Sequence, residues 1–239
     1  MPLRFAFLLF EEHPWGRELL RSLIEHGYEP ELIVQEISEA SAVERERSLA
    51  CLGGRSLAPR VVEQVRERII PVWYVHNLNS DFCGELLVAD PPDLLVMGGA
   101  RIVRETILEI PRIATVNAHP GLLPELRGSS TVGWALYKDL PQGVSVHFVD
   151  THIDEGDIIL RRELPVRRGD TFEQINGRVA ALAGEMMAEA LGCFERGAVP
   201  RIPQYRSQGE TLPPIPDEML AEGKRRLAEG TYSHYAPGA

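Results

Sequence analysis

Two short segments of this sequence carry side chains that can move protons. The first reads NAHPGLLP and spans residues 117–124. Asn117 and His119 are two residues apart on an expected strand, so their side chains share one face, and Pro120 ends the strand at that point. An amide N–H can stabilise an oxyanion and an imidazole can transfer a proton, so this pair could take part in catalysis. The alternative is a histidine that only forms a hydrogen bond at a strand end.

The second segment reads VHFVDTHIDEGD at residues 146–157 and is rich in imidazoles and carboxylates. On one extended strand, the side chains of Asp150, His152 and Asp154 would face the same way, and such a set suits Zn, Mn or Fe. However, the glycine and the dense acidic residues in this stretch favour a turn over residues 151–156. A solvated hairpin tip is therefore the preferred interpretation, and a metal site remains the alternative.

Apolar runs separated by turn residues predict an α/β fold. The opening strand–helix–strand order is typical of a parallel sheet, and one strand ends in two glycines at the sheet edge where such folds bind ligands. We therefore predict a Rossmann-like, mostly parallel twisted sheet with helices on both faces, ending in an antiparallel hairpin and a long helix. Strands are expected at 3–10, 28–36, 69–75, 91–99, 113–120, 143–150 and 157–166, and helices at 17–27, 38–68, 100–110, 129–140, 171–196 and 217–229.

The sequence also predicts how the chain is divided and how two of its helices are built. We expect residues 1–199 to form one domain and residues 200–239, which begin with a stretch rich in Pro and Gln, to form a C-terminal extension packed on it. Ser129 or Ser130 is expected to cap the helix that follows. Gly177 and Gly184 inside the long helix are expected to mark close packing against a neighbour.

Composition and missing motifs argue against several classes of protein. The chain has 239 residues and a formal net charge of −10, which disfavours nucleic-acid binding because phosphate contacts need clustered Lys and Arg. We see no secretory leader, no run of membrane-spanning length and no CxxC pair, so we expect a cytoplasmic protein without a disulfide framework or a thiolate metal site. No GxGxxG follows the first strand and no GxSxG is present, which disfavours a dinucleotide oxidoreductase and a serine hydrolase.

Together the two segments resemble the 10-formyltetrahydrofolate-dependent formyltransferase family, whose members include glycinamide ribonucleotide, methionyl-tRNA and nucleotide-sugar formyltransferases. The resemblance rests on NAHPGLLPELRG at residues 117–128 and GVSVHFVDTHIDEGDII at residues 143–159, which follow the family's order and spacing. It is strong over residues 91–195. Before them, only the general α/β layout agrees.

The resemblance implies an enzyme that moves a formyl group from 10-formyltetrahydrofolate to a primary amine without a metal. Asn117 would stabilise the oxyanion and His119 would assist proton transfer. Asp154 would hold His119 or an ordered water in place. One departure is Glu155, where many members have a small residue. The folate would be contacted, mostly through the backbone, by residues of two loops: Met97, Arg101, Ile102, Val103, Thr151, His152 and Ile153.

The resemblance also narrows the amine acceptor. Glycinamide ribonucleotide transformylases have a Gly-Ser-Asn phosphate loop, where this chain has EEHPWG at residues 11–16, whose acidic charge would repel a phosphate. Methionyl-tRNA formyltransferases normally carry a further C-terminal domain, and formyltetrahydrofolate hydrolases a further N-terminal one. We therefore expect a small-molecule amine partner, such as a nucleotide-linked amino sugar, and neither a nucleic-acid nor a membrane partner, and we leave a homodimer open. A formyltetrahydrofolate hydrolase and a non-catalytic folate-binding module are the alternatives.

Overall fold

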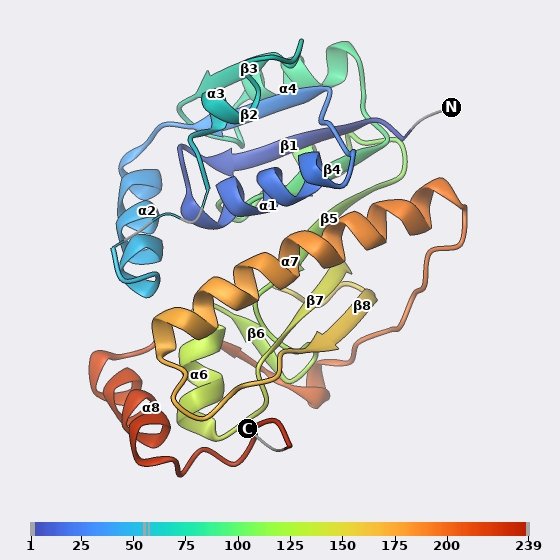
Figure 1. Ribbon diagram of the computed structural model, residues 1–239. Helices are drawn as coiled ribbons and strands as arrows, with labels where there is room; N and C mark the ends of the chain where they lie inside the picture. The colour runs from blue at the N-terminus through green and yellow to red at the C-terminus, as the bar shows by residue number, and fades with distance from the viewer. Residues whose placement is uncertain (1–2, 55, 57, 238–239) are drawn as a thin grey trace.

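A mixed sheet of seven strands forms the centre of the molecule (Figure 1). It is described from a computed structural model, which places residues 3–54, 56 and 58–237. The strand order is β3-β2-β1-β4-β5-β7-β8, in which β1 to β5 pair in parallel and β7 and β8 pair antiparallel with their neighbours. The predicted Rossmann-like sheet and its terminal hairpin are confirmed. The strands of this sheet are β1 (Phe5–Phe10), β2 (Leu32–Glu36), β3 (Val72–Val75), β4 (Leu94–Met97), β5 (Ala114–His119), β7 (Gly143–Phe148) and β8 (Ile158–Glu163).

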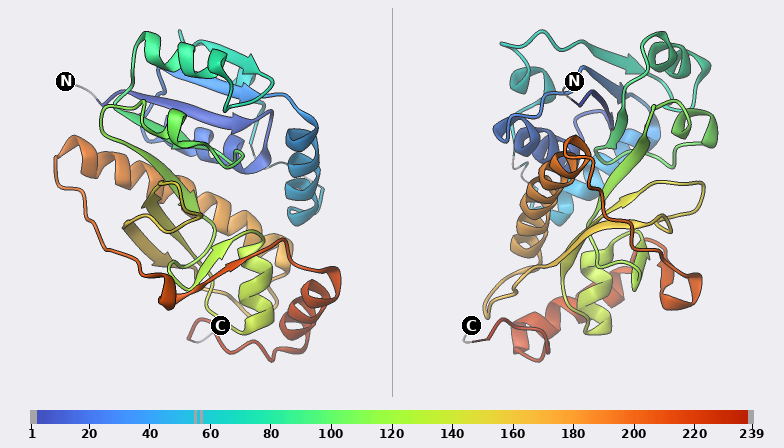
Figure 2. Two further views of the ribbon diagram at one scale, coloured as in Figure 1. Left: turned by 180° about the vertical axis from the view of Figure 1, so that it is seen from behind. Right: turned by 90° about the vertical axis from the view of Figure 1, so that its right-hand side faces the viewer.

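Helices cover both faces of the sheet (Figure 2). Because side chains alternate along a strand, Phe5, Phe7 and Leu9 of β1 point to the side of α1 and α7, whereas Ala6 and Leu8 point to the side of α4 and α5. Among the described residues, no helix has the length and apolar character needed to cross a membrane. The helices are α1 (Pro14–Glu25), α2 (Glu39–Cys51), α3 (Val61–Gln64), α4 (Asp81–Ala89), α5 (Glu105–Leu108), α6 (Thr131–Lys138), α7 (Phe172–Glu195) and α8 (Asp217–Glu229).

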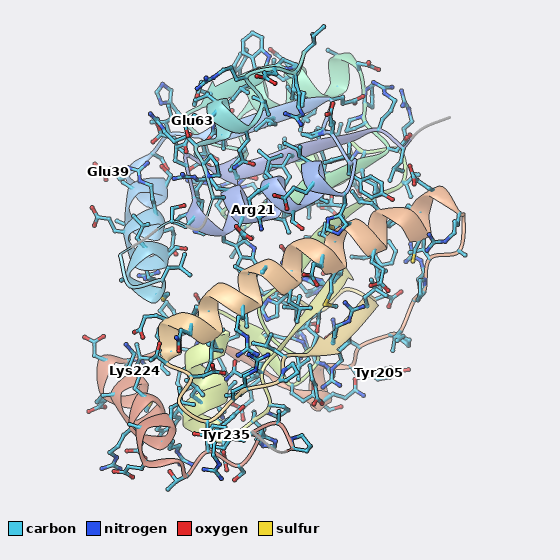
Figure 3. The ribbon with its side chains drawn as sticks, viewed as in Figure 1. Arg21, Glu39, Glu63, Tyr205, Lys224 and Tyr235 are labelled. Atoms are coloured by element: carbon cyan, nitrogen blue, oxygen red, sulfur yellow. The ribbon has the colours of Figure 1, made fainter. Side chains whose placement is uncertain are left out.

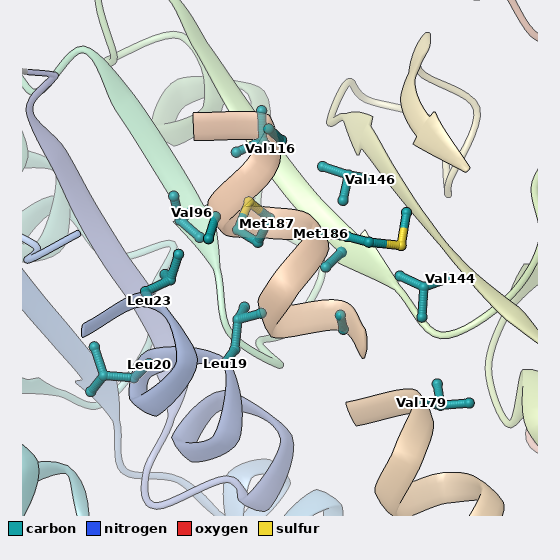
Figure 4. Packing of buried hydrophobic residues seen from close by; sticks show 14 of the residues in the cluster. Leu19, Leu20, Leu23, Val96, Val116, Val144, Val146, Val179, Met186 and Met187 are labelled. Atoms are coloured by element: carbon teal, nitrogen blue, oxygen red, sulfur yellow. The ribbon is translucent and has the colours of Figure 1, made fainter. Parts of the chain in front are cut away.

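The helices α1 and α7 cross closely over the largest of three hydrophobic clusters of buried residues in the described part of the chain (Figure 4). Leu19 and Leu23 of α1 and Met186 and Met187 of α7 are fully buried there or nearly so. At the crossing, a Cβ atom on Gly184 would lie 2.3 Å from the Cβ atom of Ser22, so the helices can approach this closely only with glycine at that position. The prediction that a glycine of the long helix marks close packing is confirmed.

The stretch 38–68, expected to be helical, is helical only in parts of its described residues: α2 covers Glu39–Cys51 and α3 covers Val61–Gln64. Helix α2 ends at Cys51 and is followed by Gly53 and Gly54, which have φ values of 68° and 79°. Positive φ is the conformation that stops a helix and favours glycine, so the chain leaves the helix here. Only the short helix α3 follows; residues 55 and 57 lie outside the described part of the chain.

Two local features differ from the sequence prediction. Helix α4 was not predicted, because exposed Phe82 and Val88 hide its helical period, although Ser80 Oγ caps it by accepting a hydrogen bond from the N–H of Cys83. Ser130 occupies the N-cap position of α6, as predicted, but its side chain makes no capping hydrogen bond. Its φ of 54° is left-handed, whereas capping serines normally have extended backbone.

The C-terminal residues pack against α6 and extend the fold (Figure 1). Trp134 Nε1 donates a 2.8 Å hydrogen bond to the carbonyl oxygen of Pro213, and the buried Tyr232 hydroxyl donates one of 2.7 Å to Leu140. A second, two-stranded parallel sheet, which the sequence did not predict, joins β6 (Leu126–Gly128) to β9 (Glu210–Leu212). The division of the chain at residue 199 stays a prediction.

Candidate active site

Asn117 and His119 lie at the carboxyl end of β5, in the interior of the sheet. Asn117 is paired in register with Met97 of β4 on one side and with His147 of β7 on the other. Its amide nitrogen lies 3.3 Å from His147 Nε2. The pairing of β5 with β7 therefore places a histidine of the second sequence segment beside the asparagine of the first.

Asp154 comes from the turn between β7 and β8 and reaches both histidines. Its Oδ2 atom lies 3.4 Å from His119 Nδ1, and its Oδ1 atom lies 3.5 Å from His147 Nε2. The backbone N–H of Gly128 donates a 2.8 Å hydrogen bond to Oδ2. The structure thus gathers Asn117, His119 and Asp154 into one cluster, and their catalytic roles stay a prediction.

Backbone carbonyl groups decide which nitrogen of each histidine carries a proton. His119 Nε2 lies 2.8 Å from the carbonyl oxygen of Leu126, and His147 Nδ1 lies 2.7 Å from that of Phe148. Because a carbonyl oxygen only accepts, we assign a proton to both of these nitrogens. His147 Nε2 is then free to accept a hydrogen bond from the Asn117 amide.

Burial sets the charges in this cluster. It lowers the pKa of His147 to about 4, so this imidazole is neutral at physiological pH. Burial also opposes ionisation of Asp154, but attraction from the His119 ring, the Gly128 N–H and the Arg127 guanidinium outweighs it and lowers the pKa of Asp154. A carboxylate therefore stands beside His119, where it can stabilise an imidazolium.

The cluster can perform two chemical tasks. Neutral His147 turns the amide nitrogen of Asn117 toward itself, which leaves the second N–H of that amide free to donate to a developing oxyanion. If His119 takes up a second proton, its two N–H groups face the Leu126 carbonyl and the Asp154 carboxylate, so the charged ring has partners on both sides. Stabilising an oxyanion and holding a proton are the requirements of acyl transfer.

The last residue of β4 and the loop after it include four of the residues expected to contact folate. The side chains of Met97 and Val103 are buried in the hydrophobic cluster on the α4 and α5 side of the sheet, so only their backbone can face a ligand. Ile102 is 71% exposed. The guanidinium of Arg101 is bound to the fully buried carboxylate of Glu36, with Nε 2.7 Å from Oε2, and it therefore fixes the loop to β2.

The turn after β7 holds the other three residues. Thr151, His152 and Ile153 are exposed, and the His152 N–H donates a 2.8 Å hydrogen bond to the side chain of Asp150. The register of β4, β5 and β7 makes this turn and the loop after β4 leave neighbouring strands on either side of β5. Contact of all seven residues with folate stays a prediction.

The loop after β1 packs against the loop after β4. The ring of His13 lies so close that a Cβ atom on Gly99 would be 2.5 Å from His13 Nδ1. The two acidic residues of this loop are each paired: Glu11 with Arg45 at 2.6 Å and Glu12 with Arg17 at 3.6 Å. These pairs weaken the expectation that EEHPWG would repel a phosphate, because much of its negative charge is neutralised.

Three residues of the site were missed as site residues by the sequence reasoning. His147 could have been found, because it stands in the same motif as Asp154 and on a strand that pairs with β5. Arg127 is buried, and Gln204 donates hydrogen bonds to the backbone of the turn that carries Asp154. Gln204 is far from the motif in sequence and carries no local signal.

Comparison with known proteins identifies the family. The chain matches the formyl transferase family over residues 3–191. The chain belongs to this family. It is 32% identical over 138 residues to the methionyl-tRNA formyltransferase of Koribacter versatilis, a match that covers 57% of this chain and 44% of that protein. The chain spans about half the length of the curated relatives it matches.

Solved structures of formyltransferases share the fold. Glycinamide ribonucleotide transformylase 1 from Symbiobacterium toebii superposes with a TM-score of 0.64 and 23% identity, covering 84% of this chain and 94% of that one. The formyltransferase PseJ from Anoxybacillus kamchatkensis, in complex with UDP-4,6-dideoxy-4-formamido-L-AltNAc and tetrahydrofolate, superposes with a TM-score of 0.55 and 20% identity, covering 87% of this chain and 85% of that one. At such identities the likeness concerns the fold alone.

Proposed function

We propose that this protein is an N-formyltransferase that moves the formyl group of 10-formyltetrahydrofolate to the primary amine of a small molecule. The observation that carries the proposal is the cluster of Asn117, His119 and Asp154 at the carboxyl end of β5, in a chain of the formyl transferase family. The tetrahydrofolate and formamido-sugar nucleotide in the Anoxybacillus complex support a folate co-substrate and a nucleotide-linked amino sugar as acceptor.

In the proposed mechanism the neutral amine attacks the formyl carbon. The new C–N bond gives a tetrahedral intermediate, and the free N–H of Asn117 donates to its oxyanion. His119 takes a proton from the attacking nitrogen, while the Asp154 carboxylate stabilises the charged ring. The bond from the formyl carbon to folate N10 then breaks as N10 receives the proton, which leaves a formamide and tetrahydrofolate.

The folate would lie between the loop after β4 and the turn after β7. Backbone groups of buried Met97 and Val103 would bind the polar edge of the pterin ring, and exposed Ile102 and Ile153 would cover its apolar surface. Arg101 would hold the first loop in place through Glu36. The other proposed contacts come from Thr151 and His152.

Methionyl-tRNA is the second candidate acceptor. It is favoured by the curated relatives, which are named methionyl-tRNA formyltransferases. The net charge of −10 favours the small amine as acceptor, because a negatively charged tRNA would be repelled by a strongly acidic protein. Both acceptors present an amine to the same cluster, so the chemistry is common to them.

The test is release of tetrahydrofolate from 10-formyltetrahydrofolate, with and without a panel of amines that includes nucleotide-linked amino sugars and methionyl-tRNA. We expect release that depends on an amino-sugar nucleotide. Release only with methionyl-tRNA would replace the acceptor, and release with no amine would replace transfer by hydrolysis. Folate binding without release under any condition would contradict the catalytic proposal and favour a binding module.

A further inference from the structure

The chain returns after α7 along residues 200–212, which we call the strap. Tyr205 lies on this segment, on the side of the molecule where β8 lies (Figure 3). Reciprocal backbone hydrogen bonds of 2.8 and 3.0 Å join Ile202 of the strap to Ile158 of β8. The strap ends in β9, which pairs with β6. It therefore touches β8, which follows the turn that carries Asp154, and β6, whose Gly128 N–H binds the Asp154 carboxylate.

Within the strap, Gln204 binds the turn that carries Asp154. Its Nε2 atom donates hydrogen bonds to the carbonyl oxygens of Asp154, at 3.1 Å, and Gly156, at 2.6 Å. The φ of Asp154 is 55°, a left-handed conformation that a residue other than glycine keeps only where its surroundings hold it. The hydrogen bonds from Gln204 to these two carbonyl groups restrain the turn in this conformation.

Arg127 in turn orients Gln204. This arginine is 1% exposed, and its Nη2 atom lies 3.1 Å from the carbonyl oxygen of Tyr205 and 3.4 Å from Gln204 Oε1. Because a guanidinium group only donates, the amide oxygen of Gln204 must face Arg127 and its nitrogen must face the turn. A second attachment joins Arg206 Nε to the carboxylate of Glu155 at 3.0 Å, which accounts for an acidic residue beside Asp154.

The strap also supports the cluster through β6. On one edge of this strand, the Leu126 carbonyl accepts from His119 and the Gly128 N–H donates to Asp154. Backbone groups of residues two apart in a strand point to the same edge, so the opposite edge of β6 is left for β9. One three-residue strand, β6, therefore lies between β9 and the side chains of His119 and Asp154.

We propose that Gln204 is a positioning residue for Asp154 and that the strap, through Gln204, contributes to the geometry of the active site. The inference rests on the proposed function, in which Asp154 is catalytic. Gln204 acts by holding the backbone of the turn, so that the carboxylate stays within reach of His119 and of the Gly128 N–H.

Three substitutions separate this role from its alternatives. Gln204→Ala removes both contacts of the amide. Gln204→Glu keeps an acceptor for Arg127 but removes the N–H donors that bind the turn. Gln208→Ala is the matched control, because Gln208 lies on the strap and, among the residues that the structure describes, its side chain accepts only from the Tyr205 N–H, at 2.8 Å.

Two readouts are needed, hydrogen exchange of the Gly128 amide and steady-state formyl transfer. The Gly128 N–H donates to the Asp154 carboxylate, so its exchange rate reports the position of Asp154. Asp154→Ala gives the exchange rate expected when this hydrogen bond is lost completely. We expect both Gln204 variants to speed exchange at Gly128 by about tenfold or more, while amides of β1 keep wild-type rates. We expect kcat to fall about 10- to 100-fold, with a KM for 10-formyltetrahydrofolate within about twofold of wild type.

Two outcomes overturn the proposal. Wild-type behaviour of Gln204→Glu would mean that Gln204 serves only to satisfy Arg127. Unchanged Gly128 exchange in both variants would mean that Gln204 does not hold Asp154. If Gln204→Ala fails to fold, exchange rises at all amides and not at Gly128 alone. The result for Gln204→Glu then tests the proposal. If the wild type formylates no amine, the proposed function fails separately, and the exchange arm still tests whether Gln204 holds Asp154.

Discussion

At the scale of single residues, the site depends on neutral and charged groups standing side by side. His147 is kept neutral by burial and fixes the amide of Asn117, while Asp154 stays ionised next to His119. The types and spacing of Asn117, His119 and Asp154 could be recognised in the sequence. The tautomers could not, because they depend on carbonyl groups that only the folded backbone brings to each ring.

This arrangement predicts the effect of removing each side chain of the cluster. Asn117→Ala, His119→Ala and Asp154→Ala should each lower kcat by about 100- to 10,000-fold, because oxyanion stabilisation and proton transfer each contribute effects of this size. Steady-state tetrahydrofolate release is the measurement, and thermal unfolding checks that the variants fold. His26→Ala, which changes a histidine at the end of α1 outside the cluster, is the control. A rate within tenfold of wild type for any of the three would remove that residue from the mechanism.

At the scale of elements, the strands that carry the cluster were predictable and the pieces that support it were not. Strands β5 (ATVNAH) and β7 (GVSVHF) have an apolar residue at every second position, which is the pattern of a strand, so both strands could be predicted from the sequence. Strands β6 and β9 have only three residues each and are far apart along the chain, so neither shows a periodic pattern. Their pairing requires the complete fold, as does the contact of Gln204 with the Asp154 turn.

The pairing of β6 with β9 can be tested at Gly128. Its φ is 89°, and a Cβ atom there would lie 2.2 Å from the carbonyl oxygen of Leu212. Gly128→Ala should therefore lower the free energy of unfolding by about 2–4 kcal/mol, through backbone strain and a clash that must part the strands. At Gly27, which has a φ of 84° and open space around its Cβ position, alanine should cost only about 1 kcal/mol. Urea unfolding measures the stability of both variants. Equal losses in the free energy of unfolding would show that β9 can move away from β6 at little cost.

At the scale of the whole molecule, the half-buried His13 and the fully buried His147 make stability depend on pH. Burial lowers the pKa of both His13 and His147 from 6.5 to about 4. Between these values the unfolded chain binds protons that the folded chain does not, so stability falls as the pH drops from about 6.5 to about 4. Each histidine can contribute up to about 3 kcal/mol to this loss, because a tenfold change in an acid dissociation constant corresponds to about 1.4 kcal/mol.

This pH dependence is checked by urea unfolding at pH 7, 6, 5 and 4.5. The free energy of unfolding of the wild type should decline across this range, and His13→Gln should show a shallower decline because it removes one of the two groups. The same slope for wild type and His13→Gln would show that His13 takes up its proton in the folded protein. A gain of stability on acidification would contradict the assignment for both histidines.

The fold as a whole brings two sequence segments to one sheet edge, and the central claim is that they transfer a formyl group there. The most direct measurement follows the formyl carbon itself. Wild-type protein is mixed with 10-[13C]formyltetrahydrofolate and a nucleotide-linked amino sugar, and the fate of the label is read by 13C NMR. The account predicts a formamide signal on the sugar with wild type and almost none with His119→Ala. Label that stays on the folate, or that appears as free formate with wild type, would contradict it.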